Sequence, residues 1–176
     1  MVIGGSHQVN SLNEDIYYGD LSAVLLQNSP FWGTWIRTPE LAIALMDEWE
    51  SKIEMLAQST INEEVTSISG VPTWTLILIK RILEITGKPT LKEVWPHLEL
   101  YIHGGVSFAP YKEQFKKLIG ADIHYQEIYN ASEGFIAVQD DLQQEGMLLL
   151  LQHGIFYEFM PVEEYGKPQP QTIGLK

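Results

Sequence analysis

Two short loops in this chain carry residue types that can bind a phosphorylated ligand. In the first, Gly104 and Gly105 have no Cβ, so their backbone can approach a flat ligand closely. In the second, Tyr129 offers an aromatic face for stacking on a heterocycle, Ser132 a hydroxyl and Glu133 a carboxylate. These oxygens suit a phosphate–magnesium centre, because Mg²⁺ usually takes one or two carboxylates together with substrate phosphates. The alternatives are an ordinary turn after a strand for the Gly-Gly pair and a solvated loop acid for Glu133.

The elements around these loops should bring both of them to one edge of a sheet. Residues 98–102 and 123–128 have the pattern of strands, and residues 110–119 between them have the pattern of a helix. A strand, a helix and a strand within about thirty residues usually form a right-handed crossover between parallel strands. Ligands bind outside the carboxyl ends of such strands. The sequence therefore predicts an α/β domain in which residues 104–105 and 129–133 border one cleft.

Other residues give no independent catalytic pattern. The five histidines are scattered, with no pair at the spacing that places two imidazoles on one helix face. His103 adjoins the Gly-Gly loop and is expected to make one backbone hydrogen bond, and His124 is expected to be structural. Ser6 lies among glycines, but Gly-x-Ser-x-Gly is absent from the chain, which argues against a serine hydrolase.

Two longer helices are expected upstream of the crossover. Thr38 and Pro39 have the types of an N-cap and a first helical residue, and apolar residues recur at helical spacing to about residue 58. A second helix over residues 73–86 is apolar on most sides and should be buried. Gly87 follows it where a C-terminal cap belongs.

The remaining segments are predicted from local signals. Residues 20–26 fit a short helix or a buried strand, and Thr90 with Glu93 fits a capping box. An aromatic cluster before the first long helix is interpreted as a core patch, with the wall of an apolar substrate pocket as the alternative; it consists of Phe31, Trp32 and Trp35. After the second loop, three segments are expected to be strands, the last two forming a hairpin; they are residues 135–138, 147–152 and 155–160.

Composition restricts the class of protein. The chain has 176 residues and 45% apolar residues, which is enough for one globular domain with a core. Its formal charge of −12 argues against nucleic acid and anionic membranes as main partners. The absence of cysteine excludes disulfides, thiol catalysis and cysteine-ligated zinc. No apolar run approaches the ~20 residues that span a bilayer, and no signal peptide is evident, so a cytoplasmic location is expected.

The hexamer Tyr129-Asn130-Ala131-Ser132-Glu133-Gly134 resembles the second adenylate-binding motif of the auxin-responsive Gretchen-Hagen family of acyl acid amido synthetases. This family belongs to the adenylate-forming superfamily. Further segments are similar to its bacterial branch, so the resemblance covers nearly the whole chain; they are residues 4–10, 18–22, 70–74, 103–106 and 154–159. The order and spacing of these segments make the match specific.

The resemblance implies a reaction and a set of site residues. The family makes an acyl-adenylate from a carboxylic acid and ATP, then passes the acyl group to the amine of an amino acid. The implied catalytic residues are Ser132, near the α-phosphate, and Glu133, which would bind Mg²⁺ together with ATP. The implied nucleotide-binding residues are Gly104, Gly105, Val106, Tyr129 (packed on adenine), Asn130, Ala131 and Ser132. The implied acid pocket comprises Gly70, Val71, Pro72, Trp74, Gly134 and Phe135.

Three parts of the family pattern are missing from these 176 residues. No Ser/Thr/Gly-rich phosphate loop precedes the matching segments, no Tyr-Arg-x-Gly-Asp motif follows them, and the mobile C-terminal domain is absent. The chain is therefore expected to be a single partial adenylate-forming domain over residues 1–176, inactive by itself. The alternatives are a fragment of an acyl-CoA ligase and a non-catalytic binding or scaffold domain. Uncovered apolar groups near Trp74, Leu76 or Phe135 are expected, with a homo-oligomer as one way to cover them.

Overall fold

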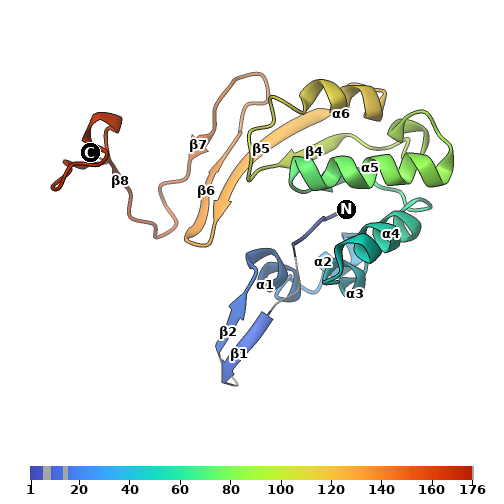
Figure 1. Ribbon diagram of the computed structural model, residues 1–176, viewed down its shortest axis with the longest axis horizontal. Helices are drawn as coiled ribbons and strands as arrows, with labels where there is room; N and C mark the ends of the chain where they lie inside the picture. Colours follow the sequence, from blue (N-terminus) through green and yellow to red (C-terminus); the bar gives the residue numbers. More distant parts are fainter. Residues whose placement is uncertain (6–8, 14–15, 176) are drawn as a thin grey trace.

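A computed structural model describes residues 1–5, 9–13 and 16–175 and is built around a five-stranded mixed sheet (Figure 1). The strand order is β3-β4-β5-β6-β7. Neighbours are parallel from β3 to β5 and antiparallel from β5 to β7. The strands are β3 (Ser67–Ser69), β4 (Leu100–His103), β5 (His124–Ala131), β6 (Gly134–Val138) and β7 (Leu148–Leu149). This arrangement confirms the predicted α/β class and the parallel crossover followed by antiparallel strands.

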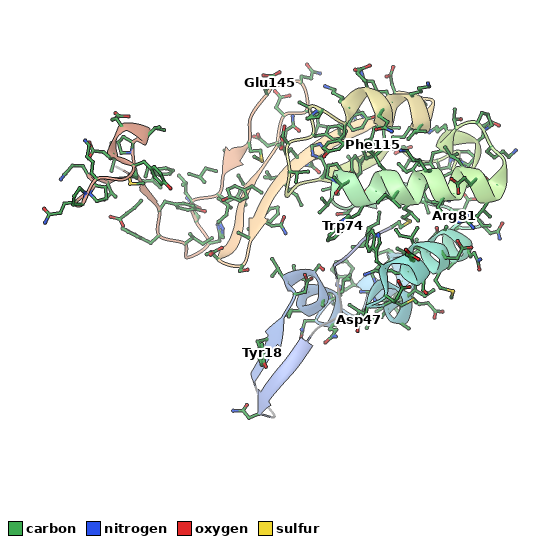
Figure 2. All side chains as sticks on the ribbon, viewed as in Figure 1. Tyr18, Asp47, Trp74, Arg81, Phe115 and Glu145 are labelled. Carbon is green, nitrogen blue, oxygen red and sulfur yellow. The ribbon has the colours of Figure 1, made fainter. Side chains whose placement is uncertain are left out.

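Two helices, α5 (Pro72–Thr86) and α6 (Lys112–Ile119), connect the parallel strands and contact each other on one face of the sheet. Right-handed crossovers place consecutive helices on the same face. The core forms there: Tyr101 of β4 stacks on Phe115 of α6 with ring centroids 4.7 Å apart, and both are fully buried. Figure 2 labels Phe115 on α6. Each helix ends at a glycine with positive φ, 64° at Gly87 and 77° at Gly120, where the chain can turn without a Cβ penalty.

The single helix expected from Thr38 to about residue 58 is wrong, because the segment forms two helices. These are α3 (Leu41–Ala44) and α4 (Trp49–Thr60). The side chain of Glu48 accepts hydrogen bonds from the backbone N–H groups of Glu50 and Ser51, so it caps a new helix start inside the apolar pattern.

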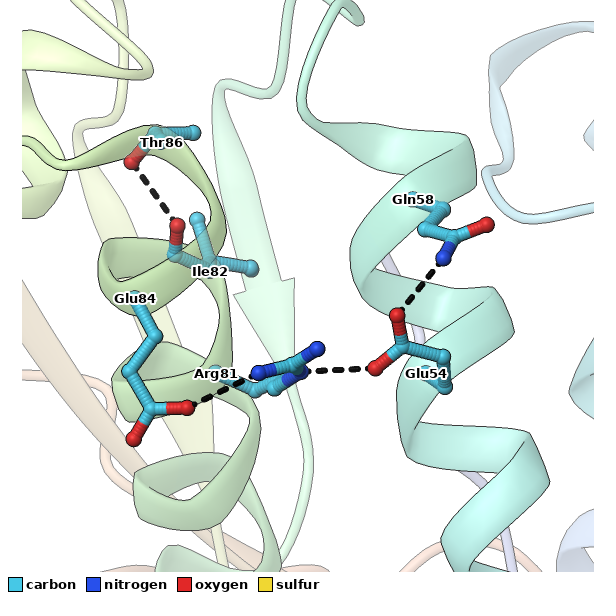
Figure 3. Close-up of polar contacts among 6 residues, drawn as sticks. All are labelled: Glu54, Gln58, Arg81, Ile82, Glu84 and Thr86. Carbon is cyan, nitrogen blue, oxygen red and sulfur yellow. Dashed lines mark hydrogen bonds and ion pairs between the residues drawn. The ribbon is translucent and has the colours of Figure 1, made fainter.

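An ion-pair cluster joins α4 to α5 at the surface. Arg81 of α5 lies 2.6 Å from Glu54 of α4 and 3.0 Å from Glu84 on its own helix (Figure 3). Gln58 donates a further hydrogen bond to Glu54. These side chains are partly exposed, so water screens the two ion pairs and their contribution to stability is small.

The N-terminal part supplies a hairpin and two short helices. Strands β1 (Val9–Asn13) and β2 (Ile16–Gly19) pair and extend away from the sheet, followed by α1 (Leu21–Gln27) and α2 (Gly33–Ile36) (Figure 1). Of the two alternatives for residues 20–26, the helix is therefore observed. The core interpretation of the aromatic cluster is wrong, because Phe31 is 75% and Trp35 80% exposed. Ser6, His7 and Gln8 of the family-like segment lie outside the described residues.

The C-terminal strands pair differently from the prediction. The hairpin expected between residues 147–152 and 155–160 is wrong: β7 pairs with β6, and β8 (Glu158–Phe159) pairs with β9 (Ile173–Gly174). Short 3-10 helices lie at η1 (Leu91–Glu93) and η2 (Val162–Glu164). The predicted capping box before η1 is not formed, because Thr90 makes no side-chain capping hydrogen bond.

Apolar exposure follows the expectation in part. Phe135 is 42% exposed and Trp74 is half-buried, whereas Leu76 itself is buried. Ile77, the next residue of α5, is the exposed one. None of the described helices combines the length and apolar content needed to cross a membrane.

Candidate functional site

A cavity of about 640 Å³ lies at the carboxyl ends of the parallel strands and brings the two glycine-containing loops together. Gly104 lies on one side of it, and the end of β5 with the following turn lies on another. The predicted site residues that line the cavity are Gly70, Val71, Trp74, Gly104, Asn130, Ala131, Ser132, Gly134 and Phe135. The edge of the sheet chosen from the crossover pattern therefore carries the cavity.

The register of β5 explains how these residues meet. Its first half pairs with β4, ending at His103 opposite Glu127. Its second half pairs with β6, ending at Ala131 opposite Gly134, so Ser132 and Glu133 form the two-residue turn between them. The cavity lies where β5 changes its partner strand.

Five predicted site residues do not line the cavity, namely Pro72, Gly105, Val106, Tyr129 and Glu133. Tyr129 is 52% and Val106 41% exposed, and the Glu133 side chain is exposed. Pro72 is buried. The loops are thus adjacent, but the side chains of Tyr129 and Glu133 are exposed outside the cavity lining.

Only glycine fits at position 104, because the neighbouring strand leaves no space for a side chain. A Cβ at this position would lie 2.3 Å from the backbone oxygen of Ile128 on β5. Gly105 differs, because its φ of 80° favours glycine while its nearest neighbour beyond the adjacent residues, Val71, leaves room at 3.6 Å. Two separate constraints therefore select the Gly-Gly pair.

A second wall of the cavity is formed by the N-terminal segment and α1, and sequence reasoning assigned it no site role. Its members include Gly4, Gly5, Ser22 and Leu25. Asp20 is the N-cap of α1, and its carboxylate accepts from the backbone N–H groups of Ser22 and Ala23. The signal available was the Asp-x-Ser pattern at a helix start, which indicates a cap and says nothing of a cavity.

His103 is buried, 4% exposed, and stacks on Phe108 with ring centroids 4.2 Å apart. The expected hydrogen bond to the backbone is not made by Nδ1, which is enclosed without a partner among the described residues. His124, by contrast, is exposed. Burial, with a smaller effect of the Lys112 charge, lowers the pKa of His103 to about 4, so its imidazole is neutral at pH 7.

This burial predicts loss of stability in acid. The unfolded imidazole binds a proton near pH 6.5, so between that pH and about 4 the unfolded state holds more protons and stability falls as pH falls. For His103 the loss should reach about 2 kcal/mol at a pH of about 5. Urea unfolding of the wild type and of His103→Gln at about pH 7 and about pH 5 measures it. Equal losses in the two proteins would contradict the assignment.

Tyr101 links the hydrophobic core to the cavity wall through a hydrogen bond. Its buried hydroxyl donates to the backbone oxygen of Gly70 at 2.9 Å and lies 3.3 Å from Oγ1 of Thr75. Burial raises the pKa of Tyr101, so the hydroxyl keeps its proton. We expect Tyr101→Phe to lower the free energy of unfolding by about 1–2 kcal/mol, because the Gly70 oxygen loses this donor. Chemical denaturation checks this, and unchanged stability would mean that water replaces the hydroxyl without cost.

The sequence model of the GH3 family N-terminal domain matches residues 5–123, which is more than half of the chain. The chain belongs to the GH3 family. This confirms the resemblance to the Gretchen-Hagen amido synthetases, although the matched range stops short of the motif at residues 129–134. A search of curated proteins found no match.

The fold of this GH3 chain also occurs in a solved structure, that of a GH3.15 acyl acid amido synthetase. The two superpose with a TM-score of 0.67 at 10% sequence identity. The match covers 90% of this GH3 chain and 38% of the other, so the chain spans well under half the length of the similar structure. At this identity the similarity concerns the fold.

Proposed function

We propose that this GH3 chain is part of an ATP-dependent ligase that joins a small carboxylic acid to an amino acid. The acid carboxylate attacks the α-phosphate of ATP and releases pyrophosphate, which leaves an acyl-adenylate. The amine then attacks the acyl carbon, AMP leaves, and the amine loses a proton. The observation that carries the proposal is the cavity at the carboxyl ends of β4 and β5, lined by both motif-bearing loops in a chain of this family.

The cavity fits a nucleotide in two respects. Gly104 lines the cavity and has no side chain, so it presents only backbone to a ring that approaches there. Asn130 and Ser132 add polar side chains beside it. In the proposed arrangement, Ala131 contacts the nucleotide inside the cavity, and Gly105, Val106 and Tyr129 contact it from outside the lining.

Glu133 fits a magnesium ion that arrives with ATP. The described residues contain no group of three acidic, histidine or cysteine side chains that could hold a metal ion by themselves. A single exposed carboxylate at the cavity rim is suited to completing the coordination of an ion already bound by phosphates. Bound there, Mg²⁺ would supply neutralisation of phosphate charge.

The acid is proposed to occupy the apolar part of the cavity. Val71, Trp74 and Phe135 line this part together with Gly70 and Gly134. Pro72 would act from behind, by fixing the start of α5. An uncharged aliphatic or aromatic body suits such walls, because burying an isolated charge is costly.

The decisive experiment is acid-dependent exchange of pyrophosphate into ATP, measured with a panel of carboxylic acids on the full-length gene product that contains these residues. Amide formation is then compared with amino acids and with coenzyme A as acceptors. Exchange followed by transfer to an amine supports the proposal. Transfer to the thiol alone would favour the acyl-CoA ligase, and absence of exchange with every acid would favour a non-catalytic domain.

The 176-residue chain by itself is expected to give no exchange and at most weak AMP binding. It contains no Ser/Thr/Gly-rich loop to hold the β- and γ-phosphates, and its charge of −12 opposes a polyanion. Calorimetric titration with AMP and the exchange assay measure the two quantities. Robust exchange by this chain would contradict the partial-domain interpretation.

The association of copies through exposed apolar faces also stays a prediction, which light scattering can test.

A further inference from the structure

Lys52 of α4 is a buried lysine whose ammonium group donates hydrogen bonds to the backbone of the cavity wall. The residue is 1% exposed, and its Nζ donates to the backbone oxygens of both Gly4, at 3.0 Å, and Gly5. Burial lowers the pKa of Lys52, and the carboxylates of Asp20 and Asp47 partly offset this effect. Burying an ammonium group costs free energy unless the group is hydrogen-bonded and balanced by opposite charge. The Lys52 side chain is therefore held at these two oxygens.

The same dipeptide is held from the opposite side by α1. The backbone N–H of Gly5 donates to Oγ of Ser22 at 2.8 Å, and the N–H of Ser22 donates to the N-cap carboxylate of Asp20 at 2.9 Å. A Cβ on Gly5 would lie 2.8 Å from that carboxylate. Gly4 and Gly5 are therefore clamped between α4 and α1, with Lys52 supplying the donors from the α4 side.

Both glycines line the cavity, whereas Lys52 does not. Beside them lie Ile3 and three leucines of α1, so most of this wall is apolar, in contrast to the polar side at Asn130 and Ser132; Asp20 and Ser22 also line it, and the leucines are Leu21, Leu25 and Leu26. The apolar body of an acid would pack between this wall and Val71, Trp74 and Phe135, and the nucleotide would pack on the polar side. Moving the dipeptide would change the shape of the acid side.

We infer that Lys52 is a positioning residue for the acid-binding side of the cavity, acting through the backbone of Gly4 and Gly5. The inference rests on the proposed function. It predicts that loss of the ammonium group weakens acid binding selectively, because the nucleotide side is formed by residues at the ends of β4 and β5.

The test is the exchange assay on the full-length gene product, with 3-phenylpropanoate as probe if the wild type activates it, and otherwise with the best acid of the panel. Lys52→Met keeps the length of the apolar stem and removes the donors. The KM for the acid should rise by about tenfold, consistent with the loss of charged hydrogen bonds, while kcat and the KM for ATP stay within about twofold. An unchanged acid KM, or equal rises in the KM values for acid and ATP, would overturn the inference.

Two further variants keep the test decisive. Thr60→Val removes another fully buried polar group from α4, a hydroxyl that donates to the Leu56 oxygen at 2.7 Å and does not line the cavity. It should lower thermal stability without a change in acid KM, and an equal rise there would overturn the inference. If Lys52→Met does not fold, Lys52→Gln replaces it, because glutamine keeps a neutral donor. This variant should give a smaller rise in the KM for the acid, and no rise would overturn the inference. A wild type without exchange contradicts the proposed function instead.

Discussion

Glu133→Gln is expected to lower acid-dependent ATP–pyrophosphate exchange by roughly 100-fold or more, the range found when one group that stabilises developing charge is removed. Glutamine keeps the size of the side chain and removes its charge. If Glu133 completes the coordination of the magnesium ion that bridges ATP phosphates, the variant neutralises less of the charge that develops as pyrophosphate leaves. AMP affinity should change little, because adenine is proposed to contact Tyr129 and the backbone of Gly104 and Gly105.

The position of Glu133 makes this test clean. Its side chain is exposed in the turn between β5 and β6, so folding should be unaffected. Glu145, another exposed acid, lies in the segment between β6 and β7 away from the cavity lining, and Glu145→Gln is the matched control (Figure 2). Normal exchange by Glu133→Gln, or the same loss in both variants, would show that Glu133 is an ordinary loop acid.

Gly104→Ala is expected to be the most damaging small substitution in the site. The added methyl carbon would lie 2.3 Å from the backbone oxygen of Ile128, and backbone cannot move aside as a flexible side chain can. Separating β4 from β5 at this point should cost about 3 kcal/mol or more, at the upper end for overpacking. It should also abolish AMP binding, because the backbone that would have to move, at Gly104 and Ile128, lines the cavity. Thermal unfolding and calorimetric titration measure the two effects.

Gly87→Ala separates crowding from backbone strain. Gly87 has a φ of 64°, and an added Cβ would meet nothing within 4 Å. Its replacement should cost only the about 1–2 kcal/mol of a left-handed residue, with AMP binding unchanged. Equal destabilisation by the two alanine variants would mean that the contact between Gly104 and Ile128 relaxes, and would remove the steric argument for the nucleotide surface.

The crossover from β4 to β5 could be predicted because local signals and the long-range constraint agree. The two strands have apolar patterns, the helix between them ends at Gly120, and such connections are right-handed. Together these constraints leave one arrangement of the two strands and the helix. The break between α3 and α4 could not be predicted in the same way. The apolar spacing continues through the break, and only the geometry of the Glu48 cap distinguishes one helix from two.

The aromatic cluster shows a different limit. Phe31, Trp32 and Trp35 have residue types that are usually buried, and composition alone cannot tell a core from an exposed surface. The wall formed by Gly4 and Gly5 was missed for a related reason. It depends on hydrogen bonds from Lys52, which is 47 residues from Gly5 in sequence. Contacts of this kind leave no periodic signal in the chain.

The change of partner strand along β5 has a consequence for how such a site can diverge. The cavity arises where β4 stops and β6 begins, so its shape depends on strand ends and on backbone at Gly104, Ile128 and Ala131. A common fold at 10% identity to the GH3.15 enzyme is what this architecture permits. New ligand preferences can therefore arise by substitution on the walls while the frame that holds them stays the same.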